Sequence, residues 1–213
     1  MDNKSSNSLV ISFLTLRKAI GCLGMALPFA LALGGMLLYQ LETQDSISGY
    51  YHTGMRDVLV GTLCAIGVFL WGYKGFDWRD NRASDIAGFS AIGVALFPTS
   101  PPNPSSIEKF IGGIHLVFAA SFFITLALIS LFLFTLSDPN KPSTPRKLQR
   151  NVIYRISGCV ILLAIGLIAL IGVLPEFLTS WLETLDPVFW LESIAIFAFG
   201  VSWFVKGEGI LED

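Results

Sequence analysis

The chain has 213 residues, of which 53% are hydrophobic and 14% charged, and its formal net charge is −2. A soluble domain of this size carries about 25% charged residues, so the composition excludes an ordinary soluble protein. The basic residues lie between apolar blocks and form no stripe, so we expect no nucleic-acid partner. The long apolar blocks instead predict an all-α, polytopic transmembrane bundle, with membrane lipid as its surroundings.

The apolar blocks are long enough to be membrane helices. A bilayer core about 30 Å thick needs roughly 20 helical residues. The blocks predict one transmembrane domain over residues 1–213, with six helices at about 19–40, 56–73, 85–97, 110–135, 152–174 and 187–205. The first block exceeds the apolar region of a cleavable signal peptide, about 7–15 residues, and is interpreted as an uncleaved helix.

The short block at 85–97 decides the topology. If all six blocks cross, twelve of the 14 Lys and Arg residues lie on one side and only Arg56 and Lys109 on the other. Because Lys and Arg collect in cytoplasmic loops, this bias predicts that the short block crosses and that both termini are cytoplasmic. Small residues at helical spacing, such as Ala87, Ala91 and Ala95, predict that its helix is buried inside the bundle.

Polar residues gather at the outer end of the second predicted helix. Ser48, Tyr51 and His52 lie in the preceding loop, and Arg56 and Asp57 open the helix. Arg56 and Asp57 are also explained as an interface anchor and a charge favoured by the helix macrodipole. His52 is also explained as a solvated loop residue.

Two ionisable residues lie deeper, and such residues are costly inside a membrane. His115 comes six residues after Lys109, and Glu192 comes six residues after Asp186. If the two flanking charges mark the outer interface, both side chains lie roughly 9 Å below it. We therefore expect His115 and Glu192 to meet, either as a hydrogen-bonded pair that fixes helix register or as part of a functional site. The inner half shows no counterpart.

The functional interpretation is one polar pocket that opens outward. It would be built from His52, Asp57, His115 and Glu192, with Ser48, Tyr51 and Arg56 nearby. Two His and two carboxylates could hold a metal such as zinc, supply acid/base groups, or bind a lipid head group. Their spacing matches no metal-binding motif.

Several stretches resemble an uncharacterised group of prokaryotic six-helix membrane proteins. These are GVALFPTSPP…IHLVFAASFF (93–123), DSISGYYHTGMRDVLVG (45–61) and VFWLESIAIFAFGVSWFVKGE (188–208). Phe97, Pro98 and His115 stand where that group has a helix ending in Phe-Pro and a His opening the next helix. The wider group is similar to the damage-regulated autophagy modulators. The resemblance implies a location in the bacterial inner membrane and no established activity.

A fainter resemblance is to alkaline ceramidases and adiponectin receptors, which are seven-helix zinc hydrolases. Ser48, His52 and Asp57 resemble the Ser, His and Asp near an early helix of that superfamily. Its His-x-x-x-His pair near the last helix is missing here, and the chain has six predicted helices.

These observations lead to three functional hypotheses. The first is a protein that binds a lipid or an apolar small molecule in the outer pocket. The second is a metal-dependent membrane hydrolase that acts on lipid amides or esters. The third is a small-solute transporter, against which the lack of polar residues in the inner half and of a broken-helix repeat both argue.

Overall fold

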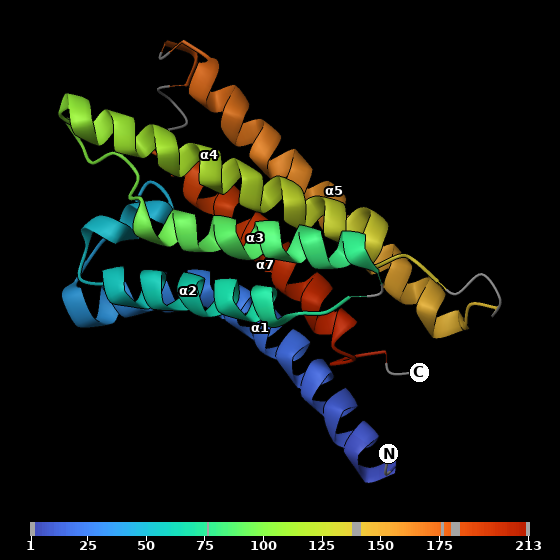
Figure 1. Cartoon of the computed structure of the whole chain (residues 1–213). Helices are drawn as coiled ribbons and strands as arrows, with labels where there is room; N and C mark the ends of the chain where they lie inside the picture. Colours follow the sequence, from blue (N-terminus) through green and yellow to red (C-terminus); the bar gives the residue numbers. More distant parts are fainter. Residues whose placement is uncertain (1–2, 76, 138–141, 176, 180–183, 212–213) are drawn as a thin grey trace.

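The computed structural model describes residues 3–75, 77–137, 142–175, 177–179 and 184–211, and within these ranges all regular structure is helical. The helices form one bundle (Figure 1). In chain order they are α1 (Asn3–Tyr39), the 3-10 helix η1 (Ser48–His52), α2 (Arg56–Gly72), α3 (Trp78–Leu96), α4 (Ser106–Leu128), the π-helix η2 (Ile129–Leu133), α5 (Pro145–Val173) and α7 (Pro187–Lys206).

Several helices begin earlier than their apolar blocks because polar caps set their first turns. Asp77 accepts hydrogen bonds from the backbone N–H groups of Arg79 and Asp80, which starts α3 seven residues before the predicted block. Ser105 and Glu108 form a capping box at the start of α4, and Thr144 caps α5. α3 thus has 19 residues and is not short.

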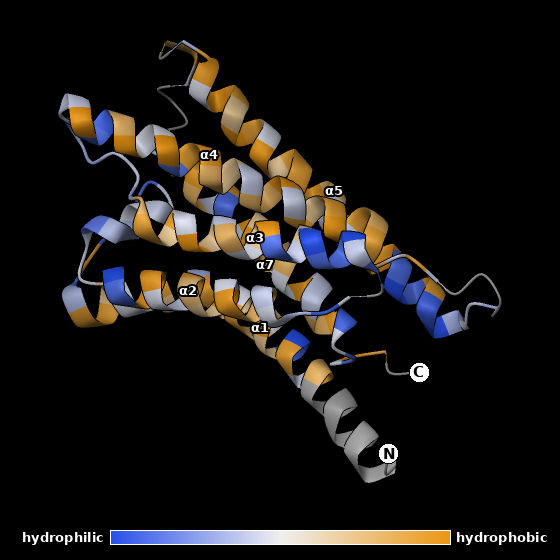
Figure 2. Cartoon of the chain, in the orientation of Figure 1, coloured by the Kyte–Doolittle hydropathy of each residue, from blue (hydrophilic) through white to orange (hydrophobic). Residues whose placement is uncertain are grey.

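The membrane character of the chain is confirmed at the level of length and hydropathy. Of the described helices, four are long and apolar enough to cross a membrane, over Phe13–Tyr39, Ser106–Leu133, Pro145–Val173 and Pro187–Lys206. α2 has only 17 residues, and α3 carries four charged residues in its first eight. Figure 2 shows the polar starts of α3 and α5 beside otherwise apolar helices.

Helix α7 packs between α1 and α5, while α2, α3 and α4 follow one another around the bundle. α7 meets α1 backbone to backbone: a Cβ atom added at Gly21 would lie 2.7 Å from the Gly200 carbonyl oxygen, and one added at Gly200 would lie 2.7 Å from that of Gly21. We call the end of the bundle that holds the start of α1 and the end of α7 the inner end (Figure 1). The opposite end, which holds η1, is the outer end.

Helix α4 changes its winding near the inner end, where η2 continues it. The backbone N–H of Phe134 donates to the carbonyl of Ile129 at 2.9 Å, which closes the wider i to i+5 turn of a π-helix. Within this turn the hydroxyl of Ser130 donates to Ser202 of α7 at 3.0 Å.

The predicted burial of the small face of α3 is confirmed. Ala87 and Ala91 are fully buried and Ala95 is 2% exposed. Gly88 lies against α2, where an added Cβ would come within 2.7 Å of the Gly67 carbonyl oxygen. Close backbone approach of this kind is typical of helix packing in membranes.

Replacing Ala91 with Leu should therefore overpack the bundle and lower the free energy of unfolding in detergent by about 1–3 kcal/mol. The matched control is Ala169→Leu, the same change at an exposed position of α5, which should leave stability nearly unchanged. Thermal unfolding of both variants checks this, and equal midpoints would contradict the packing of α3.

Candidate functional site

His115 and Glu192 share one hydrogen-bonded network, but Ser48 lies between them. The Glu192 carboxylate accepts hydrogen bonds from the backbone N–H groups of Ile47 at 2.7 Å and Ser48 at 3.3 Å. The Ser48 hydroxyl lies 3.1 Å from Nε2 of His115. The two side chains, which were expected to meet, are thus linked through η1, and the described residues show no direct hydrogen bond between them. We call this network the outer centre.

The last helical turn of α3 fixes the imidazole ring. Nδ1 of His115 lies 2.7 Å from the carbonyl oxygen of Phe97. A carbonyl oxygen can only accept, so Nδ1 carries a proton, and in the neutral ring Nε2 accepts from the Ser48 hydroxyl. Phe97 precedes Pro98, which disfavours continued helix and ends α3 at this point. The outer centre therefore ties together α3, α4, η1 and α7.

A small cavity adjoins the outer centre. It has a volume of about 30 Å³, and Glu192 and Ser48 are its polar lining among apolar side chains such as Leu27, Leu63 and Phe122. A buried water needs roughly 10–15 Å³ of such space and two or more polar partners. The cavity therefore has room for one or two waters and is too small for a lipid, unlike the open outer pocket expected from the sequence.

The other residues expected in that pocket lie on the outer rim. Nε2 of His52 lies 2.8 Å from the Thr99 carbonyl oxygen. Arg56 donates to the Tyr51 hydroxyl at 2.9 Å and stacks over its ring at 4.5 Å. Asp57 is exposed on the first turn of α2.

The expected metal ligands are consequently not assembled. Among the described residues, no three His, Cys, Asp or Glu side chains come close enough to hold one ion. His52 and Asp57 belong to the rim, whereas His115 and Glu192 belong to the outer centre. A zinc site formed by these four residues would require a rearrangement of the outer loop.

The 3-10 helix η1, which lies above the outer centre, is held in place by further contacts of Tyr50 and Thr53. Tyr50 of η1 is 1% exposed, and its ring centroid lies 6.3 Å from that of Phe189. Burial raises the pKa of Tyr50, so the phenol is neutral at physiological pH. The Thr53 hydroxyl donates to the Tyr50 carbonyl at 2.8 Å.

The expectation that the inner half lacks polar residues is wrong. Asp80 is 1% exposed and Arg150 is 7% exposed, and both lie near the inner end. Arg150 donates to the Leu211 carbonyl at 3.2 Å and lies 3.7 Å from the Glu208 carboxylate. We call Asp80, Arg150 and the partners of Arg150 the inner cluster. The sequence pattern did not identify it, because α3 and α5 begin earlier than predicted and Asp80 and Arg150 were placed in loops.

Close-packed aromatic rings separate the inner cluster from the outer centre. Ring centroids lie 6.0 Å apart for Phe122 and Phe199, and 6.2 Å apart for Phe199 and Trp203. All three side chains are at most 3% exposed. These three rings form a closely packed apolar group within the bundle.

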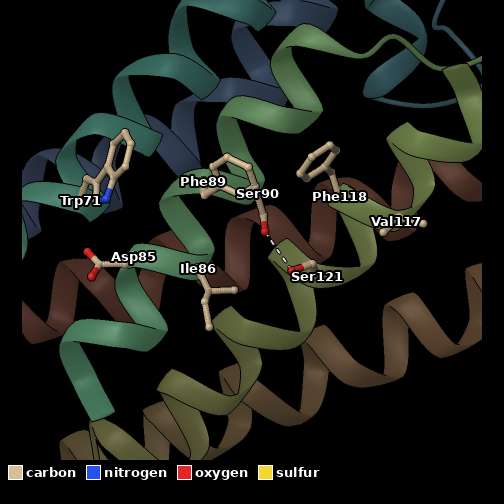
Figure 3. Close-up of a pocket in the computed structure, with 8 residues that line it drawn as sticks. All are labelled: Trp71, Asp85, Ile86, Phe89, Ser90, Val117, Phe118 and Ser121. Carbon is tan, nitrogen blue, oxygen red and sulfur yellow. Dashed lines mark hydrogen bonds between the residues drawn. The ribbon is translucent and has the colours of Figure 1, made fainter. Parts of the chain in front are cut away.

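Among the described residues, two wider grooves lie on the apolar sides of the bundle. The larger, about 540 Å³, lies between α1, α5 and α7, and we call it the α1–α5 groove; Phe29, Val160, Phe189, Trp190 and Phe197 are among its lining residues. The second, about 420 Å³, lies over α3 and α4 beside the inner part of α2, and we call it the α3–α4 groove (Figure 3).

No protein-family model, curated protein or solved structure matches the chain.

The bridge through Ser48 can be tested with a double-mutant cycle in detergent. His115→Ala combined with Glu192→Gln should show a coupling energy of about 0.5–3 kcal/mol in unfolding free energy, because the two residues share one network. The same cycle in a Ser48→Ala background should give a value near zero. His115→Ala combined with Asp57→Asn serves as the control and should be additive. Additivity of the first cycle would show that Ser48 does not connect the two residues.

Proposed function

We propose that this protein is an integral membrane protein that binds a lipid chain or an apolar small molecule in the α1–α5 groove. The observation that supports this most directly is the groove itself, whose volume of about 540 Å³ lies within the range of about 300–1,000 Å³ typical of small-molecule sites. Binding would occur on the surface that faces the acyl chains.

The chemistry of the groove favours a mostly apolar ligand with a small polar group. Phe29 and Phe197 form an edge-to-face pair at 6.2 Å, and both are more than 40% exposed, so a chain can lie against their rings. The Ser193 hydroxyl lines the groove and is buried without a hydrogen-bond partner among the described residues. It would donate a hydrogen bond to a hydroxyl, ester or amide oxygen of the ligand.

The groove lies beside the outer centre on the same helix. Ser193 directly follows Glu192, so the two side chains leave α7 in different directions, one toward the groove and the other toward η1. In this proposal the outer centre acts as a fixed support for the groove and does not itself contact the ligand.

The two alternatives have less support. A metal-dependent hydrolase needs a set of ligands around one ion, and the described residues hold no such set. A small-solute transporter would have to open the ring packing of Phe122, Phe199 and Trp203 between the polar ends of the bundle.

We further propose that all six long helices cross the membrane and that both termini lie in the cytoplasm. α2 and α3 lack the length or hydropathy of the other four, but α2 packs on α1 and α3 packs on α4 over many residues. Together with the Lys and Arg distribution, this arrangement favours six crossings. A bacterial inner membrane is the location that this topology and the resemblance to prokaryotic proteins favour.

Reporter fusions test the topology. Fusions after Arg82 and after Ser143 should report cytoplasm, and a fusion after Pro102 should report the exterior, because the segments lie at opposite ends of α3 and α4. A cytoplasmic signal at Pro102 would remove the crossing of α3 and with it the proposed orientation.

Filling the α1–α5 groove tests lipid binding. Ala32→Phe places a ring in the groove and should reduce co-purified lipid several-fold, measured by mass spectrometry per mole of protein. Leu163→Phe, at an exposed site of α5 outside the groove lining, is the matched control and should retain lipid as the unmodified chain does. Equal retention in both variants would argue against this groove as the binding site.

A further inference from the structure

The α3–α4 groove differs from the α1–α5 groove because it contains a carboxylate. Figure 3 shows Asp85 and Trp71 on one side of it, Phe89 between them and the Ser90–Ser121 hydrogen bond, and Phe118 beyond. The hydroxyls of Ser90 and Ser121 lie 2.9 Å apart and share one hydrogen bond. Asp85 is the ionisable group among the residues that line this groove.

The charge of Asp85 is not balanced by its neighbours. Among the described residues the carboxylate makes no hydrogen bond or ion pair. The nearby basic side chains of α3 are engaged elsewhere: the guanidinium of Arg79 lies 5.6 Å from the ring centroid of Trp78, and that of Arg82 lies 5.4 Å from it. A carboxylate in an apolar groove is costly without a partner.

The groove has a polar end and an apolar end. Asp85 lies one turn beyond Arg82 on α3, which is about 4.5 Å further from the inner end of the bundle. Phe89 lies one turn further again and contacts Phe118 edge to face at 5.6 Å. Trp71 is 52% exposed and Phe89 is 58% exposed, so both ring surfaces are open to a ligand.

We propose that the α3–α4 groove binds a hydrophobic cation, an ammonium-bearing amphiphile taken from the membrane. Its ammonium group lies between the Asp85 carboxylate and the Trp71 ring, and its apolar chain extends over Phe89 and Phe118. Aromatic rings and a carboxylate together favour an organic cation over a neutral or anionic molecule of the same shape. This site is separate from the α1–α5 groove and does not depend on lipid binding there.

Fluorescence quenching in phosphatidylcholine vesicles tests this assignment. The probe is an alkyltrimethylammonium ion with a brominated chain, which quenches tryptophan on contact. The full chain should show saturable quenching, and this component should disappear in Trp71→Phe. An alcohol with the same brominated chain should bind at least fivefold more weakly than the cation, because it cannot use the carboxylate.

The charge requirement is tested at Asp85 itself. Asp85→Asn should weaken binding of the cation about fivefold or more while leaving the alcohol unchanged, and Asp85→Glu should retain most of the affinity. Asp57→Asn, which removes an exposed carboxylate at the outer end, is the matched control and should have no effect.

Two results would overturn the proposal: equal affinity of the unmodified chain for the cation and the alcohol, or unchanged cation affinity in Asp85→Asn. The first comparison uses only the unmodified protein, so it decides the question even if the variants do not fold. Either result would leave lipid retention by the α1–α5 groove unaffected, because Ala32→Phe tests that groove separately.

Discussion

The carboxylate of Glu192 organises the outer end of the bundle. The oxygens of a carboxyl group buried on a membrane helix need hydrogen-bond donors, and α7 cannot supply them because its backbone N–H groups beyond the first turn are used within the helix. The donors come from the loop that precedes α2, through Ile47 and Ser48. Satisfying one carboxylate therefore fixes η1 on top of the bundle, and this places the Ser48 hydroxyl beside His115.

This interaction explains why little space is left beside the outer centre. Once η1 covers the helices, the space left beside Glu192 and Ser48 is only about 30 Å³. Two larger spaces formed by described residues lie on the apolar sides of the bundle. If the proposed binding in the α1–α5 groove holds, a ligand would enter from within the membrane.

Much of this arrangement could be predicted from the sequence. The apolar blocks located the helices, and the spacing from flanking charges placed His115 and Glu192 at one depth. The link through Ser48 could not be predicted, because backbone N–H groups carry no signature in the sequence. The starts of α3 and α5 were also not predicted, because hydropathy does not detect polar first turns. For the same reason, the sequence did not identify Asp80 and Arg150 as buried helical residues. The grooves could not be predicted either, because lipid-facing and core-facing apolar residues are of the same types in a membrane protein.

The π-turn at Ile129–Leu133 has a consequence for the end of α4. One extra residue in a turn rotates everything beyond it by roughly 100° relative to a continuous α-helix. The outer segment directs His115 toward η1, whereas the turn itself directs Ser130 toward Ser202 of α7. His115 and the start of the turn are joined by regular α-helix, on which the two polar residues lie about 60° apart. The helix thus presents a polar side chain to a different neighbour at each depth, and the turn changes the direction in which the chain leaves α4 at Phe134.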